Sequence, residues 1–387
     1  SLFESAEADR SPTNGIITGL DVAGLKTAAD KDAALRTTEL QVVSQAKQLE
    51  NPDARVAFGN ELIKELLNNS SRCHHGLVCG DRPRMCVFFW EVITNIKIWI
   101  PYCGTVNNNI HYSGKETYLR WVGGTGAIKE LKGATNLETN AWEKTGIVIS
   151  AMGGLPVTMY TGMAFDNNTS VIVPHDPAHL PAIWCFCSSP EYHEVVRQID
   201  QSLKVTNATL VKVPFDLARW TQVAKEQYPH GLPQPFSDDP TQWIFHGHPC
   251  GSVIWDEREK RTAEGPLRED ATVLQVAVAR LLGYRWPAEL DLQKTSGRMP
   301  LPQLDPQMAL APEQRLWVGR CESLLSHQDD DGIVCIAPVR GEDPAAERLL
   351  NLLAAAYGDA WRPERHSRPW AATRRQSPPP PGSAGAR

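Results

Sequence analysis

The sequence predicts a mixed α/β domain over residues 71–216, followed by a mostly helical carboxy-terminal region over residues 217–360. In the first range, short apolar and aromatic runs are separated by Gly and Asn turns, a pattern typical of strands. In the second, apolar residues recur at helical spacing between Pro-rich stretches. The 387 residues are enough for about two domains.

Residues 1–70 are expected to hold a linker and helices. Residues 1–30 are polar and contain Gly, which is typical of a linker or loop. Residues 31–49 carry apolar side chains at helical spacing and end before Asn51-Pro52, a stop signal. Residues 58–67 form a second short amphipathic pattern.

The mixed domain is expected to alternate strands with two helices. The helices are predicted over residues 180–187 and 191–203. The predicted strands are 85–92, 96–100, 118–122, 146–150, 170–174 and 209–213.

The carboxy-terminal region is expected to be helical with Pro-rich insertions. Asp216 is a good N-cap for a helix that runs to about residue 228. Residues 229–265 are expected to be mostly loop, and 361–387 to be a disordered tail. Three more helices are predicted over 267–282, 312–326 and 345–357, with a short strand over 332–336.

Charge and cysteine content restrict the possible partners and the compartment. The formal net charge is −6, so a DNA-binding role would need a local basic surface or help from another domain. The nine cysteines are an odd number, and no secretory signal or membrane-length apolar run is present. We therefore expect a cytoplasmic protein with reduced thiols and no membrane contact.

A turn with two glycines, an aspartate and two arginines precedes an aromatic strand. Residues 76–84 read GLVCGDRPR, and residues 88–92 read FFWEV. Such a turn can present backbone N–H groups and guanidinium groups to phosphates. It is equally compatible with an ordinary solvated turn before a strand.

This element resembles the start of the target-recognition domain in large adenine-specific DNA methyltransferases of restriction-modification and phage-defence systems. Cys79 stands where Thr is usual, Met85-Cys86 where Phe is usual, and Asn107 to Asn109 interrupt a Gly-rich approach. Further segments resemble the family in the expected order: WIPY at 99–102, YLRW at 118–121, WEKTGIVIS at 142–150, FD at 165–166, VIVP at 171–174, IWCFCSS at 183–189, LKVTNATL at 203–210, DPTQWIFHGHP at 239–249 and LQVAVARLLGYRWP at 274–287.

The resemblance covers about residues 20–360 and implies recognition of duplex DNA. The complete enzymes transfer a methyl group from S-adenosylmethionine to adenine. They use a Gly-rich cofactor loop and an Asn/Asp-Pro-Pro-aromatic motif, which lie upstream of the matching region. Neither occurs in this sequence, because residues 51–54 and the glycines of 122–126 do not fit. We therefore expect a fragment that follows the catalytic domain and is inactive alone, with that domain or subunit as a partner.

Candidate DNA-contacting residues divide into phosphate contacts and base readers. Asn can pair with adenine and Arg with guanine in the major groove. In the family, residues 150–155 would form a loop near the target base. Each candidate named below is equally compatible with ordinary polar surface. The phosphate candidates are Arg82, Arg84, Lys97, Lys115 and Lys204, the base candidates are Asn107, Asn108, Asn109 and Arg120, and Ser150 is a DNA-binding candidate as the start of the loop near the target base.

Two Cys/His groups have side chains that could serve a metal or catalytic site. Cys73, His74, His75 and Cys79 match no common zinc spacing, so a chance cluster in a loop is expected and no metal is predicted. His246 and His248 lack a paired carboxylate, and a structural turn is expected there.

Two other functions remain open. The first is a stand-alone, non-catalytic DNA-binding or assembly subunit of a defence system. The second is an unrelated hydrolase that uses His246 and His248. The acidic run Asp329 to Asp331 before Gly332 is expected to be a solvated turn, because the later carboxylate of a calcium loop is absent.

Overall fold

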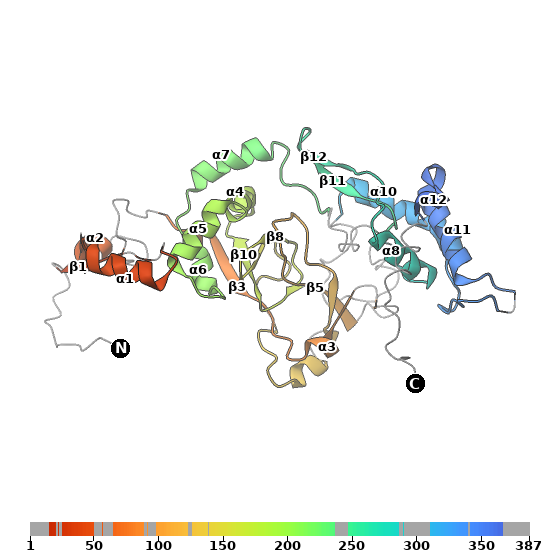
Figure 1. Ribbon diagram of the computed structural model, residues 1–387, viewed down its shortest axis with the longest axis horizontal. Helices are drawn as coiled ribbons and strands as arrows, with labels where there is room; N and C mark the ends of the chain where they lie inside the picture. The colour runs from red at the N-terminus through yellow and green to blue at the C-terminus, as the bar shows by residue number, and fades with distance from the viewer. Residues whose placement is uncertain are drawn as a thin grey trace, which may run out of the picture.

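The computed structural model shows a mixed α/β protein with a mostly helical carboxy-terminal part, as predicted. Along the longest axis, the amino-terminal elements, two central sheets and the carboxy-terminal helices follow one another (Figure 1). The structure describes residues 15–20, 22, 25–49, 56, 65–88, 91, 98–122, 126–137, 139–236, 247–285, 289, 310–339 and 341–366.

The first central sheet is antiparallel and has the strand order β3-β10-β7-β8. Its strands are β3 (Ser71–His75), β10 (Thr169–Pro174), β7 (Gly146–Ser150) and β8 (Val157–Tyr160). β7 and β10 lie in the centre and are buried along their whole length. Their continuous Val and Ile runs fit a sheet that is covered on both faces.

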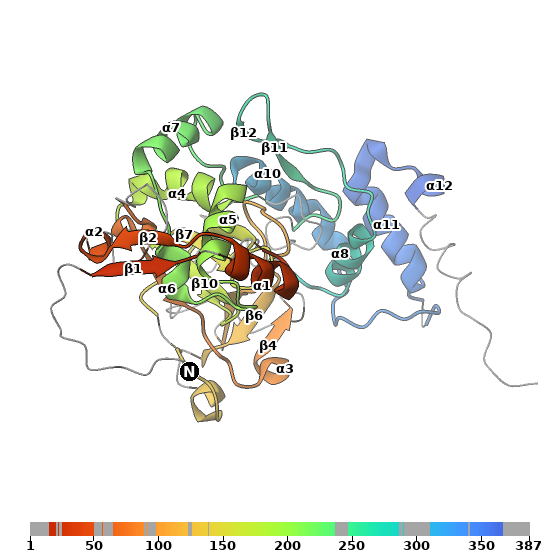
Figure 2. The ribbon, with the colours of Figure 1, turned by 60° about the vertical axis from the view of Figure 1, so that its left-hand side comes forward.

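Helices cover one face of this sheet. Ile147 and Ile172 share a hydrophobic cluster with Trp184 and Phe186, so the helices that follow the sheet pack on it (Figures 1 and 2). Three of these helices have polar N-caps at Ser189, Thr206 and Asp216, which define where they begin. The helices are α4 (Leu180–Cys187), α5 (Pro190–Ile199), α6 (Asn207–Val211) and α7 (Leu217–Gln227).

The second central sheet has the order β4-β6-β5-β9, with β5 and β9 parallel and the other pairs antiparallel. Its strands are β4 (Cys86–Phe88), β6 (Thr117–Arg120), β5 (Trp99–Cys103) and β9 (Ala164–Phe165). The single helical turn α3 (Arg82–Met85) leads into β4. β9 continues through the turn at Asp166 into β10, so this turn connects the two sheets.

The carboxy-terminal part contains a hairpin and several helices. Its core is a hydrophobic cluster between α8 (Thr272–Leu281) and α11 (Ala345–Tyr357). Beside it, the buried Arg280 guanidinium donates to both carboxylate oxygens of Glu289, at 2.5 and 3.0 Å. The other elements in the described residues of this part are β11 (Val253–Asp256), β12 (Arg261–Glu264), α10 (Pro312–Arg320), two 3₁₀ helices (Cys321–His327 and Gly358–Ala360) and α12 (Pro363–His366).

An aromatic cluster joins the two central sheets to this carboxy-terminal part. His111 stacks on Trp184 with 5.0 Å between ring centroids, and Trp255 of β11 lies 5.9 Å from the same imidazole. The Tyr228 hydroxyl accepts from Trp184 Nε1 at 3.0 Å and lies 2.9 Å from His111 Nε2. Burial lowers the pKa of His111 to about 4, so its imidazole is neutral at physiological pH.

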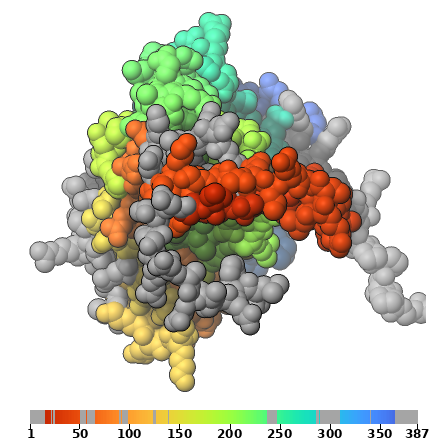
Figure 3. Space-filling model, turned by 90° about the vertical axis from the view of Figure 1, so that its left-hand side faces the viewer, coloured from red at the N-terminus to blue at the C-terminus, as the bar shows by residue number. Residues whose placement is uncertain are grey.

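The amino-terminal segment differs from the prediction of a linker followed by one helix over 31–49. Residues in the expected linker form β1 (Ile16–Gly19), which pairs antiparallel with β2 (Gln41–Ser44). Between them lies α1 (Ala28–Thr37), which has no buried residue, and α2 (Gln45–Leu49) follows β2. This segment lies on the outside of the molecule (Figure 3).

Several other predicted elements match the structure and some do not. β7, α4 and α11 have the predicted bounds. Residues 209–213 belong mostly to helix α6 rather than to a strand, because the Thr206 hydroxyl caps a helical turn there. Residues 332–336 are not a strand, and the expected loop over 229–265 contains the β11–β12 hairpin. Among the described residues, no helix has both the length and the apolarity to cross a membrane.

Candidate nucleic-acid interface

The loop after β5 contains Asn107, Asn108 and Asn109, and we call it the Asn loop. The Ser150 hydroxyl attaches it to the end of β7. Ser150 Oγ accepts from the backbone N–H of Val106 at 2.9 Å and donates to the Val106 carbonyl at 3.1 Å. Ser150 itself is buried. The residue predicted as a DNA contact therefore holds the Asn loop beside the loop that follows β7.

The three asparagines of this loop have different environments. Asn109 donates to the Ser188 carbonyl at 2.9 Å, and its Oδ1 accepts from the Val157 N–H at 3.0 Å. Its side chain thus ties the loop to α4 and β8. Asn107 and Asn108 are exposed, as is Asn109, and they lie at the tip of the loop before it.

The loop between β7 and β8 projects next to the Asn loop. Gly153 has φ +62 and nothing within 4 Å of where a Cβ would lie, as expected at an open loop tip. The Gly153 carbonyl accepts from Arg197 Nη2 at 2.7 Å. Leu155 is buried and anchors the loop, whereas Met152 is exposed. The result is a loop with an open tip whose backbone is supported by Arg197.

Lys204 lies beside the same loop. It forms an antiparallel bridge with Met152, and Val205 donates to the Ala151 carbonyl at 2.9 Å. The exposed Lys204 ammonium donates to the Asn167 carbonyl at 2.9 Å. Lys204 therefore connects the loop after β7 to the turn between β9 and β10.

Arg82 lies on the other side of that turn. Its Nη1 is 3.5 Å from Asp166 Oδ2, and Asp166 also accepts from the Tyr102 hydroxyl at 3.1 Å. The backbone before Arg82 lies close to this turn. A Cβ added to Gly76 would lie 2.0 Å from the Asp166 carbonyl oxygen, so only glycine fits there. About half of the Arg82 side chain is exposed, at 53%. Arg84 is exposed on the same helical turn, α3.

Seven of the ten predicted residues thus gather around two loops and one turn. We call this region the loop surface: Arg82, Arg84, Asn107, Asn108, the loop 151–155 and Lys204, supported by the exposed Asn109 and the buried Ser150.

Two predicted residues lie elsewhere, and one falls outside the described residues. Lys115, expected at a phosphate, is buried at 1% exposure, with its ammonium 4.6 Å from the Tyr112 ring centroid and donating to Thr161 Oγ1 at 3.3 Å. A lysine in that position does not reach a phosphate. Arg120 is the last residue of β6, where it is exposed and lies opposite Trp99 of β5 in the sheet. Lys97 lies outside the described residues.

Three residues of the Cys/His cluster, Cys73, His74 and His75, lie on β3 and not in the expected loop, whereas Cys79 lies in the loop that follows the strand. Cys73 of β3 packs against the helix-covered core, and burial raises its pKa to about 12. His74, the next residue along β3, faces the opposite side of the sheet. Among the described residues, no group of three His, Cys, Asp or Glu side chains could hold a metal ion.

The other candidate sites have structural roles in the described part of the chain. His248 is buried with its ring centroid 4.9 Å from that of Trp317, and burial lowers its pKa to about 3. His246 lies outside the described residues. Asp329 pairs with Arg348 at 2.6 Å and accepts from two backbone N–H groups, so the acidic run forms a closed turn.

Comparisons with known proteins include a weak likeness to a solved structure. Neither a protein-family model nor a curated protein matches the sequence. The fold is distantly similar to a Type IIL restriction-modification enzyme, MmeI, whose structure was solved in complex with DNA. The identity is 12% and the TM-score 0.27, over 86% of this chain and 40% of the other. The chain therefore spans less than half the length of that enzyme.

Proposed function

We propose that this chain recognises a specific sequence in duplex DNA, as the target-recognition portion of a site-specific adenine methyltransferase. The motifs between residues 99 and 210 that resemble this family lie, in order, on elements of the two central sheets and their covering helices. The observation that carries the proposal is the double hydrogen bond between Ser150 and Val106. It brings two separate loops together with exposed amides and cations around them.

In this proposal, the residues of the loop surface make two kinds of contact, with DNA phosphates and with base edges. The exposed Arg82, Arg84 and Lys204 contact phosphates and set the register on the duplex. The Asn107 and Asn108 amides each have a donor and an acceptor, the combination that adenine presents in the major groove. Because the net charge is −6, we expect weak and salt-sensitive binding by the chain alone.

Methyl transfer belongs to the complete enzyme in this proposal. S-adenosylmethionine and the flipped adenine would bind to a catalytic domain or subunit, because this sequence has neither the cofactor loop nor the Asn/Asp-Pro-Pro-aromatic motif. The same observation favours a second candidate, a stand-alone DNA-binding or assembly subunit. Methyl transfer by this chain mixed with a methyltransferase catalytic subunit, compared with either alone, distinguishes the two.

The salt dependence of DNA binding tests the loop surface. We would measure fluorescence anisotropy of a labelled duplex for the full chain and for the variant Arg82→Ala/Arg84→Ala/Lys204→Ala. Each lost phosphate contact should reduce the slope of log K against log salt by about 0.9, so the triple variant should lose about 2.7. The matched control is Lys26→Ala/Lys225→Ala/Arg258→Ala, which removes three exposed charges elsewhere. Equal slopes for the two triple variants would refute this surface.

A further inference from the structure

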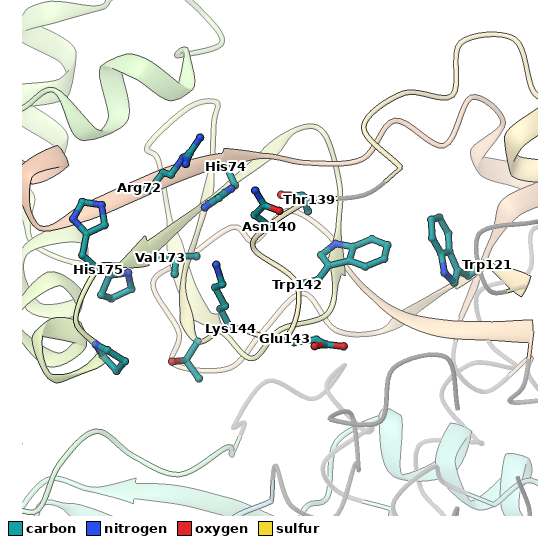
Figure 4. Close-up of a pocket in the computed structure, with 13 residues that line it drawn as sticks. Arg72, His74, Trp121, Thr139, Asn140, Trp142, Glu143, Lys144, Val173 and His175 are labelled. Atoms are coloured by element: carbon teal, nitrogen blue, oxygen red, sulfur yellow. The ribbon is translucent and has the colours of Figure 1, made fainter. Parts of the chain in front are cut away.

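A cavity opens at the other end of β7 from the loop surface. Ser150 is the last residue of β7, whereas Lys144 and Thr145, which line the cavity, directly precede its first residue. The cavity volume is about 1390 Å³, larger than the roughly 300–1000 Å³ of ordinary small-molecule pockets. Its walls come from β3, the end of β10 and the turn before β7 (Figure 4).

Cationic and imidazole side chains from three segments face this cavity. Arg72 and His74 are alternate residues of β3, so they lie on the same face of the sheet. Figure 4 shows the Lys144 ammonium pointing toward His74 and Asn140. His175, which follows β10, adds a second imidazole. Within the described part of the chain, neither Arg72 nor Lys144 forms an ion pair.

The charges in the cavity favour an anion. The pKa of His74 is lowered by burial first, and then by the positive charges of Arg72 and Lys144. Arg72 and Lys144 therefore both lie close enough to His74 to act on its imidazole. Glu143 is the one carboxylate among the described lining residues, and in Figure 4 it lies beside Trp142, away from Arg72 and His74. The end of the cavity with the cations is thus suited to a phosphate group.

The other end of the cavity is aromatic. Trp142 is half-buried in the wall, and Trp121 packs against it edge-on with 5.0 Å between ring centroids. The indole N–H of Trp142 is buried without a hydrogen-bond partner among the described residues. Glu143 next to it has φ +66, a conformation that non-glycine residues rarely adopt, and its N–H donates to the Gly162 carbonyl at 2.9 Å. A strained turn held in this way sets the position of both Trp142 and Lys144.

We propose that this cavity is a nucleotide site, in which Arg72 and Lys144 hold a phosphate and Trp142 packs against the base. Guanidinium and ammonium groups bind phosphate oxygens, and an indole face stacks on any base. The nucleotide is either free or part of a nucleic-acid strand, and both present the same chemistry to the cavity. The site is separate from the loop surface and does not depend on the function proposed for it.

Calorimetry with the full chain tests the nucleotide site. The probes are adenosine 5′-monophosphate, adenosine and inorganic phosphate. We expect the nucleotide to bind with one-to-one stoichiometry and at least tenfold tighter than adenosine or phosphate. Arg72→Ala/Lys144→Ala should weaken nucleotide binding by roughly tenfold per cation, as for charge-assisted hydrogen bonds. Both side chains are exposed, so the variant should keep its thermal unfolding midpoint.

A matched control separates this site from other charges. Lys225→Ala/Arg258→Ala removes two exposed charges elsewhere. This variant should bind the nucleotide with unchanged affinity. The proposal is overturned if the nucleotide binds no tighter than phosphate, if it does not bind, or if Arg72→Ala/Lys144→Ala leaves its affinity unchanged. A single-stranded pentanucleotide that binds tighter than the mononucleotide identifies a strand as the source, and the reverse identifies a free nucleotide.

Discussion

The two central sheets and the carboxy-terminal helices are stabilised in different ways. The first central sheet lies against helices along a large apolar cluster that includes Ile147, Ile172 and Phe186 and extends to Trp317 of the carboxy-terminal part. The carboxy-terminal helices add a smaller apolar cluster of their own and a buried ion pair, Arg280–Glu289, whose guanidinium also donates to the carbonyls of Gly247 and Cys321. An apolar core tolerates exposed polar loops at its edges, whereas a buried ion pair makes a region depend on single residues.

This difference also bears on where the residues proposed for DNA recognition lie. The loop surface is attached to fully buried strands, so Asn107, Asn108 and Lys204 can remain exposed without loss of the core. Binding residues on loops that a rigid scaffold holds in place are the usual arrangement. We expect the central sheets to be the binding part and the carboxy-terminal helices to be the more easily unfolded part.

The largest expected effect on stability is at the buried ion pair. Glu289→Gln leaves the buried Arg280 charge without its partner and should lower the free energy of unfolding by about 3–5 kcal/mol. Urea unfolding measures this loss. The control is Glu259→Gln, which removes a partner from the 90% exposed Arg258 and should cost less than about 1 kcal/mol. Equal losses in the two variants would contradict the contrast between the two regions.

Lys115 provides the second effect, in the central sheets. Burial lowers its pKa from 10.5 to about 7 in the folded chain, so the unfolded chain binds more protons between these values. The Lys115 contribution to stability therefore rises with pH from about 7 to about 10.5, and it is at its minimum below pH 7.

Lys115→Met should remove this pH dependence and stabilise the chain at pH 7 by a few kcal/mol, since one pKa unit corresponds to about 1.4 kcal/mol. Unfolding free energies of both proteins across pH 6–10 measure it. If the difference between them is the same at every pH, Lys115 remains charged in the fold.

A smaller effect is expected at Ser150. Ser150→Ala leaves the buried Val106 N–H without its acceptor and should cost about 1–3 kcal/mol. Hydrogen exchange at the Val106 amide should become faster, while exchange in β10 should stay slow. The control is Ser323→Ala, which removes an exposed hydrogen bond in the carboxy-terminal part. Unchanged exchange at Val106 would show that the Asn loop does not depend on Ser150.

Elements with clear periodicity could be predicted from the sequence, and others could not. The continuous apolar run of β7 and the helical spacing of α11 gave correct bounds. β3 reads SRCHH, and its position at the edge of the sheet allows polar side chains that hide the strand pattern. Residues 209–213 are too short an apolar run to separate a strand from the helix that Thr206 caps.

The loop surface was partly predictable and the cavity was not. Polar residues near loops pointed to Arg82, Asn107 and Lys204, but burial decides their roles, and sequence does not give the burial of Lys115 or Ser150. The cavity joins Arg72, Lys144 and His175, which are more than 100 residues apart from first to last. Only the pairing of β3 with β10, and of β10 with β7, brings them together.

The central claim is that the loop surface reads a DNA sequence, and selection from a random duplex library tests it most directly. The full chain should enrich one short motif, and Asn107→Ala/Asn108→Ala should lose the preference at one or two base pairs, each worth about 1–3 kcal/mol. Lys225→Ala/Arg258→Ala should enrich the same motif as the unaltered chain. Enrichment of no motif, or of an unchanged motif by the Asn variant, would contradict the claim.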